Sequence, residues 1–282
     1  MTAGFGARLR TALDTHGPLC VGIDPHVSLV EEWGFEASGA GIREFGLRVV
    51  EASAGRVGVV KPQVAFFERF GAAGFAALED VLRAARDAGL VVIADAKRGD
   101  IGSTMDGYAA AWLSAGSPLE ADAVTLNPYL GADSLRDTLA SAVATGKGAF
   151  VLAATSNPEA HVLQSASVHG AGAETVAARV AREAAVAGGA SVDSLGPIGV
   201  VVGATADREA VGLTDAALEQ LPILAPGFGA QGAEPRDLRR LFGRVARNVV
   251  ASESRSILSA GPDRLAARID ERAGLYAEVN LG

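Results

Sequence analysis

The sequence predicts an α/β protein that folds as a single (β/α)8 barrel, or TIM barrel, over residues 1–282. Three observations support this prediction. The chain has a length at which such barrels fold as one domain. Eight short apolar stretches alternate with about eight helical patterns, and no linker or low-complexity tract separates them. Polar residues follow the C-terminal ends of the strands, where barrel enzymes build their sites, and this favours the barrel over a doubly wound parallel sheet.

Four strands are predicted in the first half of the chain, because four apolar runs with β-branched residues end abruptly at polar residues or proline. Between these runs, apolar residues recur at helical spacing, as at Ile42, Phe45 and Val49. The predicted elements are, in order, a strand over 19–23, a loop over 27–39, a helix over 41–54, a strand over 57–60, a helix over 66–88 interrupted near Gly71, a strand from residue 91, a helix over 101–115 and a strand over 123–126.

The second half repeats this alternation, and short stretches rich in Gly, Pro, Ser and Thr, which are typical of turns, follow several of its strands. The predicted elements are, in order, a helix over 133–145, a strand over 149–153, a loop over 159–171, a helix over 174–187, a strand over 198–203, a helix over 207–220, a strand over 222–224, a helix near 235–242, a strand over 248–251 and a last helix over 263–279.

The composition excludes several classes of function. A formal net charge of −8 and a pI near 5.1 argue against a nucleic-acid-binding surface. No apolar run approaches the length of a membrane span, and residues 1–10 lack the apolar core of a signal peptide. The single Cys20 rules out an internal disulfide and is expected in the core. We therefore expect a cytoplasmic protein with no nucleic-acid or membrane partner.

Four charged residues near two neighbouring strand ends form a candidate catalytic cluster. Asp95 and Lys97 stand two residues apart at the end of the third strand, so their side chains project from the same face. Asp100 stands at the expected N-cap of the next helix, and Thr104 follows one turn later on the same side. Lys61, at the end of the second strand, completes a tetrad of alternating charge. Alternating signs keep the lysines protonated, so that one can act as a general acid. The structural alternative is a strand-end ion pair followed by an ordinary helix cap.

A glycine-rich loop over 227–232 follows the seventh strand. The loops after strands seven and eight of such barrels commonly bind phosphate, because glycines let backbone N–H groups approach an anion. Gly229 and Gln231 belong to this loop, and Arg255, just past the eighth strand, would add a bidentate contact. Turn glycines without a ligand are the alternative interpretation.

Further polar residues follow other strand ends and are candidates for the same site. Asp24 follows the first strand, Asn127 the fourth, and Thr155 and Ser156 the fifth. A plain turn before Asn157-Pro158 is the alternative for the last two. The four histidines are scattered without metal-ligand spacing, so no metal site is predicted.

These residues resemble a known family. Asp95-Ala96-Lys97-Arg98-Gly99-Asp100-Ile101, with Thr104, is similar to the D-x-K-x-x-D-I…T signature of orotidine 5′-phosphate decarboxylase. The longer bacterial subgroup of that family resembles this chain at further positions, and five motifs appear in order at successive strand ends. The further motifs are Gly22-Ile23-Asp24-Pro25, Lys61-Pro62-Gln63-x-Ala65-Phe66-Phe67-Glu68, Asn127-Pro128-Tyr129-Leu130-Gly131 and Thr155-Ser156-Asn157-Pro158.

The resemblance implies a decarboxylation of orotidine 5′-monophosphate to uridine 5′-monophosphate without a cofactor, at the last step of de novo pyrimidine synthesis. It implies that Asp24 and Lys61 hold ribose hydroxyls, that Asp95 crowds the substrate carboxylate, and that Lys97 protonates C6. It further implies a homodimer whose partner supplies the residues matching Asp100, Ile101 and Thr104. Thr155 or Ser156 would contact the pyrimidine, and Gly229, Gln231 and Arg255 would contact the phosphate. Residues 159–196 have no counterpart in the compact members of the family.

Two other functions are compatible with parts of the pattern. A magnesium-dependent decarboxylase of sugar phosphates, such as 3-keto-gulonate 6-phosphate decarboxylase, shares the Asp-x-Lys-x-x-Asp strand. By resemblance, however, that sister enzyme has an acidic metal ligand on its second strand, at the position where this chain has Lys61. A non-enzymatic barrel that binds a phosphorylated ligand would keep the 227–232 loop and Arg255 but would not need the charged tetrad.

Overall fold

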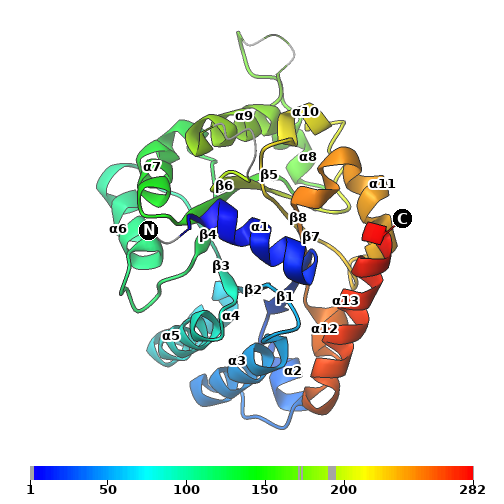
Figure 1. Cartoon of the computed structure of the whole chain (residues 1–282). Helices are drawn as coiled ribbons and strands as arrows, with labels where there is room; N and C mark the ends of the chain where they lie inside the picture. The colour runs from blue at the N-terminus through cyan, green and yellow to red at the C-terminus, as the bar shows by residue number, and fades with distance from the viewer. Residues whose placement is uncertain (1–2, 171, 173, 190–194, 282) are drawn as a thin grey trace.

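A closed barrel of eight parallel strands, in the order β1 to β8, forms the centre of the protein (Figure 1). The computed structural model describes residues 3–170, 172, 174–189 and 195–281. The predicted fold class is confirmed, and each strand overlaps its predicted range. The strands are β1 (Leu19–Ile23), β2 (Val59–Pro62), β3 (Val91–Arg98), β4 (Ala123–Leu126), β5 (Gly148–Ala154), β6 (Ile198–Val202), β7 (Ile223–Pro226) and β8 (Val249–Glu253).

Helices surround the strands and close one end of the barrel (Figure 1). The predicted interruption near Gly71 is confirmed, because α4 ends before Gly71, which has a φ of 58°, and α5 begins there. The α-helices are α1 (Phe5–His16), α2 (Val27–Glu32), α3 (Gly39–Ser53), α4 (Val64–Glu68), α5 (Gly71–Asp87), α6 (Gly102–Leu113), α7 (Arg136–Ala144), α8 (Ala160–Gln164), α9 (Val176–Gly188), α10 (Asp215–Leu218), α11 (Leu238–Phe242), α12 (Arg255–Leu258) and α13 (Leu265–Leu281), and the 3-10 helices are η1 (Ala132–Leu135), η2 (Pro235–Asp237), η3 (Gly243–Asn248) and η4 (Pro262–Arg264).

The predictions for three segments need correction. The segments predicted as loops over 27–39 and 159–171 contain the short helices α2 and α8. The helix predicted over 207–220 is only the single turn α10, because Asp207 caps a separate turn through the Ala210 N–H and Gly212, at a φ of 76°, ends it. Thr214 then caps α10 by accepting from the Ala217 N–H at 3.3 Å.

The interior of the barrel is filled by alternate residues of the strands and by α1. Helix α1 runs across the ring of strands in Figure 1 and inserts Phe5, Leu9 and Leu13 against the interior side chains. The interior cluster includes Cys20, whose burial raises the pKa of its thiol to about 12, as expected of a core thiol. On β3 the interior residues are Val91 and Ile93. Because side chains alternate along a strand, the next residues on this face are 95 and 97, at the open end of the barrel.

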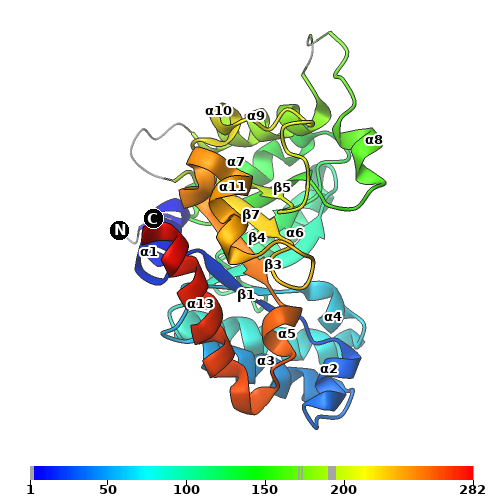
Figure 2. The same ribbon diagram turned by 90° about the vertical axis from the view of Figure 1, so that its right-hand side faces the viewer.

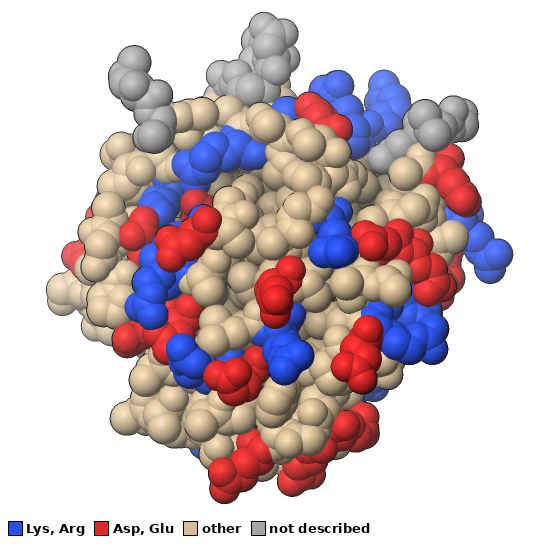
Figure 3. Space-filling view, turned by 60° about the horizontal axis from the view of Figure 1, so that its bottom comes forward, with Lys and Arg blue, Asp and Glu red and all other residues tan. Residues whose placement is uncertain are grey.

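The two ends of the barrel are built differently. Figure 2 shows α1 and both chain ends on one side, and α2, α4 and α8, which follow strands β1, β2 and β5, on the other. Basic and acidic side chains interleave on the face in Figure 3, and neither sign gathers there into one patch. Within the described residues, none of the helices is both long enough and apolar enough to span a bilayer.

Candidate active site

A cavity of about 330 Å³ opens at the C-terminal ends of the strands, directly above the interior core. Its floor contains Leu152, Val201 and Leu224, which point into the barrel. The walls combine predicted residues with residues that the sequence did not single out. The predicted ones are Asp24, Lys61, Asp95, Lys97, Thr155, Gln231 and Arg255, and the others with polar side chains are His26, Gln63, Ser252 and Ser254.

Three of the four residues of the predicted tetrad meet in this cavity. Lys61 Nζ donates to Asp95 Oδ2 at 2.9 Å, and Lys97 Nζ donates to Asp95 Oδ1 at 2.6 Å. Lys61 and Asp95 are buried, whereas 44% of the Lys97 side chain is exposed toward the opening. The carboxylate therefore fixes one lysine beneath it and holds the other at the surface of the cavity.

The backbone of Lys97 is held in an unusual conformation. With a φ of 50°, Lys97 is the one non-glycine residue with positive φ among those the structure describes. The pairing of β3 with β4 shifts register at this point. Thr125, inside β4, accepts from the Lys97 N–H at 2.9 Å and donates its hydroxyl to Asp95 Oδ1 at 2.9 Å. Left-handed backbone is uncommon for residues with a Cβ and concentrates at functional sites, where neighbouring contacts hold it in place.

Gln63 completes the hydrogen bonds around the carboxylate. In the amide orientation that its neighbours favour, its nitrogen donates to Asp95 Oδ2 and its oxygen accepts from Lys97 Nζ at 3.2 Å. Burial alone would raise the pKa of Asp95, but the charges of Lys61 and Lys97 outweigh it and lower that pKa well below its usual range. Burial opposes charge on Lys61 as well, and there the charges of Asp95 and Asp24 raise the pKa above its usual value. Asp95 and Lys61 are therefore both ionised at neutral pH.

Asp24 offers an unused acceptor to this cavity. Its Oδ1 atom is buried and has no hydrogen-bond partner among the described residues. A buried carboxylate oxygen without a donor costs free energy, so Asp24 Oδ1 is suited to accept a hydrogen bond from a bound ligand. His26, whose ring is tilted by 51° against that of Phe66 with centroids 4.1 Å apart, also lines the cavity.

The structure separates Thr155 from Ser156. Thr155 lines the cavity, whereas Ser156 is exposed and is not among the lining residues. The Thr155 hydroxyl donates to Asn157 Oδ1 at 2.7 Å and accepts from Gln164 Nε2 at 3.0 Å. Gln164, on α8, also accepts from the Thr155 N–H at 3.0 Å. The hydroxyl proton is thus committed, and one acceptor lone pair remains free for a ligand N–H.

The predicted phosphate loop forms another part of the cavity wall. Gly227, Ala230 and Gln231 line the cavity, and so does Arg255, the first residue of α12, which follows the neighbouring strand β8. The Gly229 N–H donates to Ala233 O at 2.7 Å, so Gly229 sets the path of the loop instead of presenting that donor to the cavity.

The remaining predicted site residues do not line the cavity of their own chain. The N-cap of α6 is Ile101 and not Asp100. The Asp100 carboxylate accepts from the Ile101 N–H at 2.8 Å. Ile101 is 62% exposed, and Thr104 is exposed as well. Asn127 is exposed, and its side chain closes a turn by accepting from the Tyr129 N–H at 3.1 Å. Within one chain, Asp100 therefore does not join Lys61, Asp95 and Lys97, and its place in the tetrad stays a prediction.

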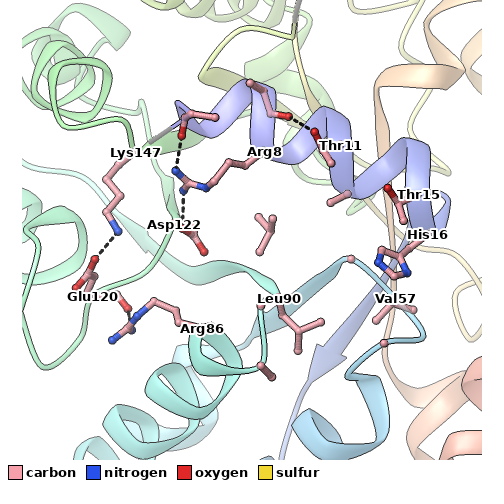
Figure 4. Close-up of a pocket in the computed structure, with 18 residues that line it drawn as sticks. Arg8, Thr11, Thr15, His16, Val57, Arg86, Leu90, Glu120, Asp122 and Lys147 are labelled. Carbon is pink, nitrogen blue, oxygen red and sulfur yellow. Dashed lines mark hydrogen bonds and ion pairs between the residues drawn. The ribbon is translucent and has the colours of Figure 1, made fainter. Parts of the chain in front are cut away.

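A second cavity, of about 690 Å³, lies at the opposite end of the barrel beneath α1 (Figure 4). Its charged side chains pair with one another: Arg8 with Asp122 at 2.6 Å, and Lys147 with Glu120 at 2.6 Å. Lys147, the third lysine, thus has a structural partner far from the first cavity. In the part of the chain that the structure describes, no three His, Cys, Asp or Glu side chains are grouped to hold a metal ion.

Comparison with known proteins gives a consistent result. Residues 17–269 match the family model described as Orotidine 5'-phosphate decarboxylase / HUMPS family. A curated protein from Streptomyces coelicolor named orotidine 5'-phosphate decarboxylase is 52% identical over 268 residues, 94% of this chain and 93% of that protein. A crystal structure assigned to the same enzyme, from Streptomyces avermitilis, aligns with a TM-score of 0.93 and 46% identity over 100% of this chain and 97% of that one. The OMP decarboxylase of Leishmania donovani aligns with a TM-score of 0.78 and 31% identity over 99% of each chain.

Proposed function

The chain belongs to the orotidine 5′-phosphate decarboxylase family, and from this premise we propose which of its residues carry out the reaction of that family. The protein decarboxylates orotidine 5′-monophosphate (OMP) to uridine 5′-monophosphate (UMP) in pyrimidine biosynthesis. The observation that carries the assignment of roles is the Lys61–Asp95–Lys97 chain of ion pairs in the cavity wall. The reaction needs no metal or cofactor in this proposal.

Lys97 is the proton donor. The bond between C6 and the substrate carboxylate breaks, CO₂ leaves, and the electron pair that remains on C6 takes a proton from Lys97 Nζ. Asp95, held ionised by its two lysines, repels the substrate carboxylate in the ground state. That repulsion falls as the charge moves to C6, next to the Lys97 ammonium, so the site favours the transition state over the substrate.

The other walls bind the remaining parts of the nucleotide. A ribose hydroxyl supplies the hydrogen bond that the buried Asp24 Oδ1 lacks, and Lys61 contacts the ribose beside it. Thr155, in preference to Ser156, accepts from the pyrimidine N–H with its free lone pair. Gln231 and Arg255 bind the phosphate across the loop shaped by Gly229. Arginine is suited to this role because its fork matches two phosphate oxygens.

The site is completed by a second copy of the chain, in a homodimer. Asp100, Ile101 and Thr104 point away from their own cavity in this proposal and enter that of the partner. Ile101 is 62% exposed, and Tyr129 and Leu130 on the adjoining loop are 73% and 52% exposed. The two loops pack together where the Gly99 backbone meets the Asn127 carbonyl. Apolar exposure of this kind is typical of an interface.

The buried ammonium of Lys61 distinguishes this function from that of a metal-dependent sugar-phosphate decarboxylase. Its Nζ lies 2.9 Å from Asp95 Oδ2, so a divalent cation beside that carboxylate would meet a fixed positive charge. We further assign residues 1–282 to one decarboxylase domain with a cytoplasmic location.

The test follows the ultraviolet absorbance of OMP mixed with the purified protein in EDTA. We expect loss of OMP, formation of UMP and no effect of the chelator or of added magnesium. Turnover that disappears with EDTA and returns with magnesium would instead favour the sugar-phosphate class of mechanism.

A further inference from the structure

Beneath the proposed phosphate site lies a buried carboxylate with no part in the reaction. Glu253, the last residue of β8, is 1% exposed. Its oxygens accept hydrogen bonds from four donors, two of them on one arginine of α13. The contacts are Arg272 Nε at 2.8 Å, Arg272 Nη2 at 2.9 Å, Tyr276 Oη at 2.8 Å and Ser256 Oγ at 2.7 Å.

Arg272 also reaches the segment after β7. Both of its Nη atoms lie 3.2 Å from Glu234 Oε2, and Glu234 is the second residue after the 227–232 loop. One arginine, itself 8% exposed, therefore joins the segment after β7 to the end of β8. Only a planar guanidinium, with several N–H donors in fixed directions, can contact two carboxylates in this way, so lysine would not replace Arg272.

The loop rests directly on this cluster. The ring of Phe228 meets that of Tyr276 edge to face, with centroids 5.9 Å apart. A Cβ at Gly229 would collide with Ser256 Oγ and lie 2.9 Å from Glu253 Oε2, so the Gly229 backbone lies against the Glu253 carboxylate and its Ser256 donor. Phe228, which contacts this cluster, and Arg255, which is next to Ser256 in the chain, both line the cavity.

We propose that Arg272 is a positioning residue for the phosphate site, which rests on the function proposed above. It does not touch the substrate. It fixes the distance between the 227–232 loop and Arg255, so that both are in place before the phosphate arrives. A site preformed in this way spends less binding energy on ordering its loops and leaves more for the chemical step.

The test compares ligands with and without phosphate in two variants. Arg272→Lys keeps a positive charge beside Glu253 but loses the fork. Glu234→Gln removes the charge that Arg272 contacts beside the loop, keeps an amide oxygen that can cap η2, and leaves the buried Glu253 pair intact, so it should fold even if the first variant does not. Arg268→Met, at an arginine of α13 that pairs with Glu271, serves as the matched control. Melting temperatures establish that each variant is folded.

We expect Arg272→Lys to weaken UMP binding, and to lower kcat/KM for OMP, by about tenfold or more while uridine binding changes less than about twofold. Glu234→Gln should show the same selectivity with a smaller loss, and Arg268→Met should match the wild type. Equal loss of UMP and uridine affinity, or unchanged UMP affinity in the folded variants, would overturn the proposal. A wild-type protein that does not decarboxylate OMP would refute the proposed function instead, so the two failures are separable.

Discussion

Lys97 combines a strained backbone with a half-exposed ammonium, and both features fit a proton donor. Its left-handed conformation is maintained by the Thr125 hydroxyl and by the bond from Nζ to Asp95. A flexible lysine on a regular strand would sample many positions, whereas this one is directed at a single point above Asp95. The residue is therefore oriented before a substrate binds, which is the condition for efficient general-acid catalysis.

Replacing Lys97 tests this role. Lys97→Ala should lower kcat for OMP by at least about 10³-fold while UMP still binds, because the fold and the phosphate wall are untouched. Lys97→Arg should also fail, since the guanidinium is wider and holds its proton more tightly. Steady-state kinetics and calorimetric titration with UMP provide the measurements. Near-normal activity in either variant would place the acid elsewhere.

The ionised state of Asp95 links stability to pH. In the unfolded chain its pKa is about 3.9. In the folded protein the charges of Lys61 and Lys97 outweigh burial and lower it. A depressed pKa gives stability that is fully present above the unfolded pKa and is lost as the pH falls toward the folded one. Asp95→Asn should reduce the free energy of unfolding at pH 7 by about 3–5 kcal/mol, because Lys61 is left buried and unpaired.

The difference in the free energy of unfolding between the wild type and Asp95→Asn should narrow by about 0.5–1 kcal/mol between pH ~5 and ~3.5. In this range the unfolded wild-type chain takes up a proton at Asp95 that the folded protein does not. Urea unfolding of both proteins across this range is the measurement. A constant difference between the two proteins would mean that Asp95 has an ordinary pKa when folded.

Residues at strand ends were predictable, but those that support them were not. Asp95 and Lys97 interrupt an apolar strand and therefore stand out in the sequence. Thr125 lies inside an apolar run, where threonine is an ordinary β-former, and nothing local indicates that it bonds to both Asp95 and Lys97. Arg272 is one of many arginines, and its role depends on contacts with residues 19 and 38 positions away.

At the scale of elements, the strands were predictable because a buried parallel strand is a continuous apolar run with a clear end. Short helices were less so: α2 and α8 have only six and five residues, too few for a helical period to show. The error over 207–220 has a specific cause. Arg208 bonds to Leu213 O and to Asp215, which folds the chain back where a continuous helix would run straight.

The loops after β7 and β8 should act together on the phosphate. Arg255→Ala should weaken UMP binding by about 10–100-fold, the value of a charge-assisted hydrogen bond of about 1.5–3 kcal/mol, and leave uridine nearly unaffected. Calorimetric titration with both ligands is the measurement. Arg264→Ala, an exposed arginine outside the cavity lining, is the control. A loss of the same size for uridine would make Arg255 a structural residue.

For the molecule as a whole, α1 covers one end of the closed barrel, and the candidate active site lies at the other end. Phe5, Leu9 and Leu13 cover the interior at the N-terminal ends of the strands. The cavity that contains Lys61, Asp95 and Lys97 therefore opens at the C-terminal ends of the strands. There one chain supplies Lys61, Asp95 and Lys97 but directs Asp100 elsewhere. A site with one missing member is expected when two copies of a chain exchange residues across a two-fold axis.

This exchange can be tested with two inactive variants, Lys97→Ala and Asp100→Asn, mixed under conditions that let dimers re-form. In a mixed dimer, one site contains both lesions, because the Lys97→Ala chain receives its Asp100 position from the other variant. The opposite site receives an intact Lys97 and an intact Asp100 and should work. Free exchange makes about half of the dimers mixed, each with one good site of two, so activity should recover to roughly a quarter of the wild-type value. Tagged chains confirm exchange independently. A mixture that stays inactive despite exchange would show that Asp100 serves its own chain, and the apolar surface around Ile101 would then need another explanation.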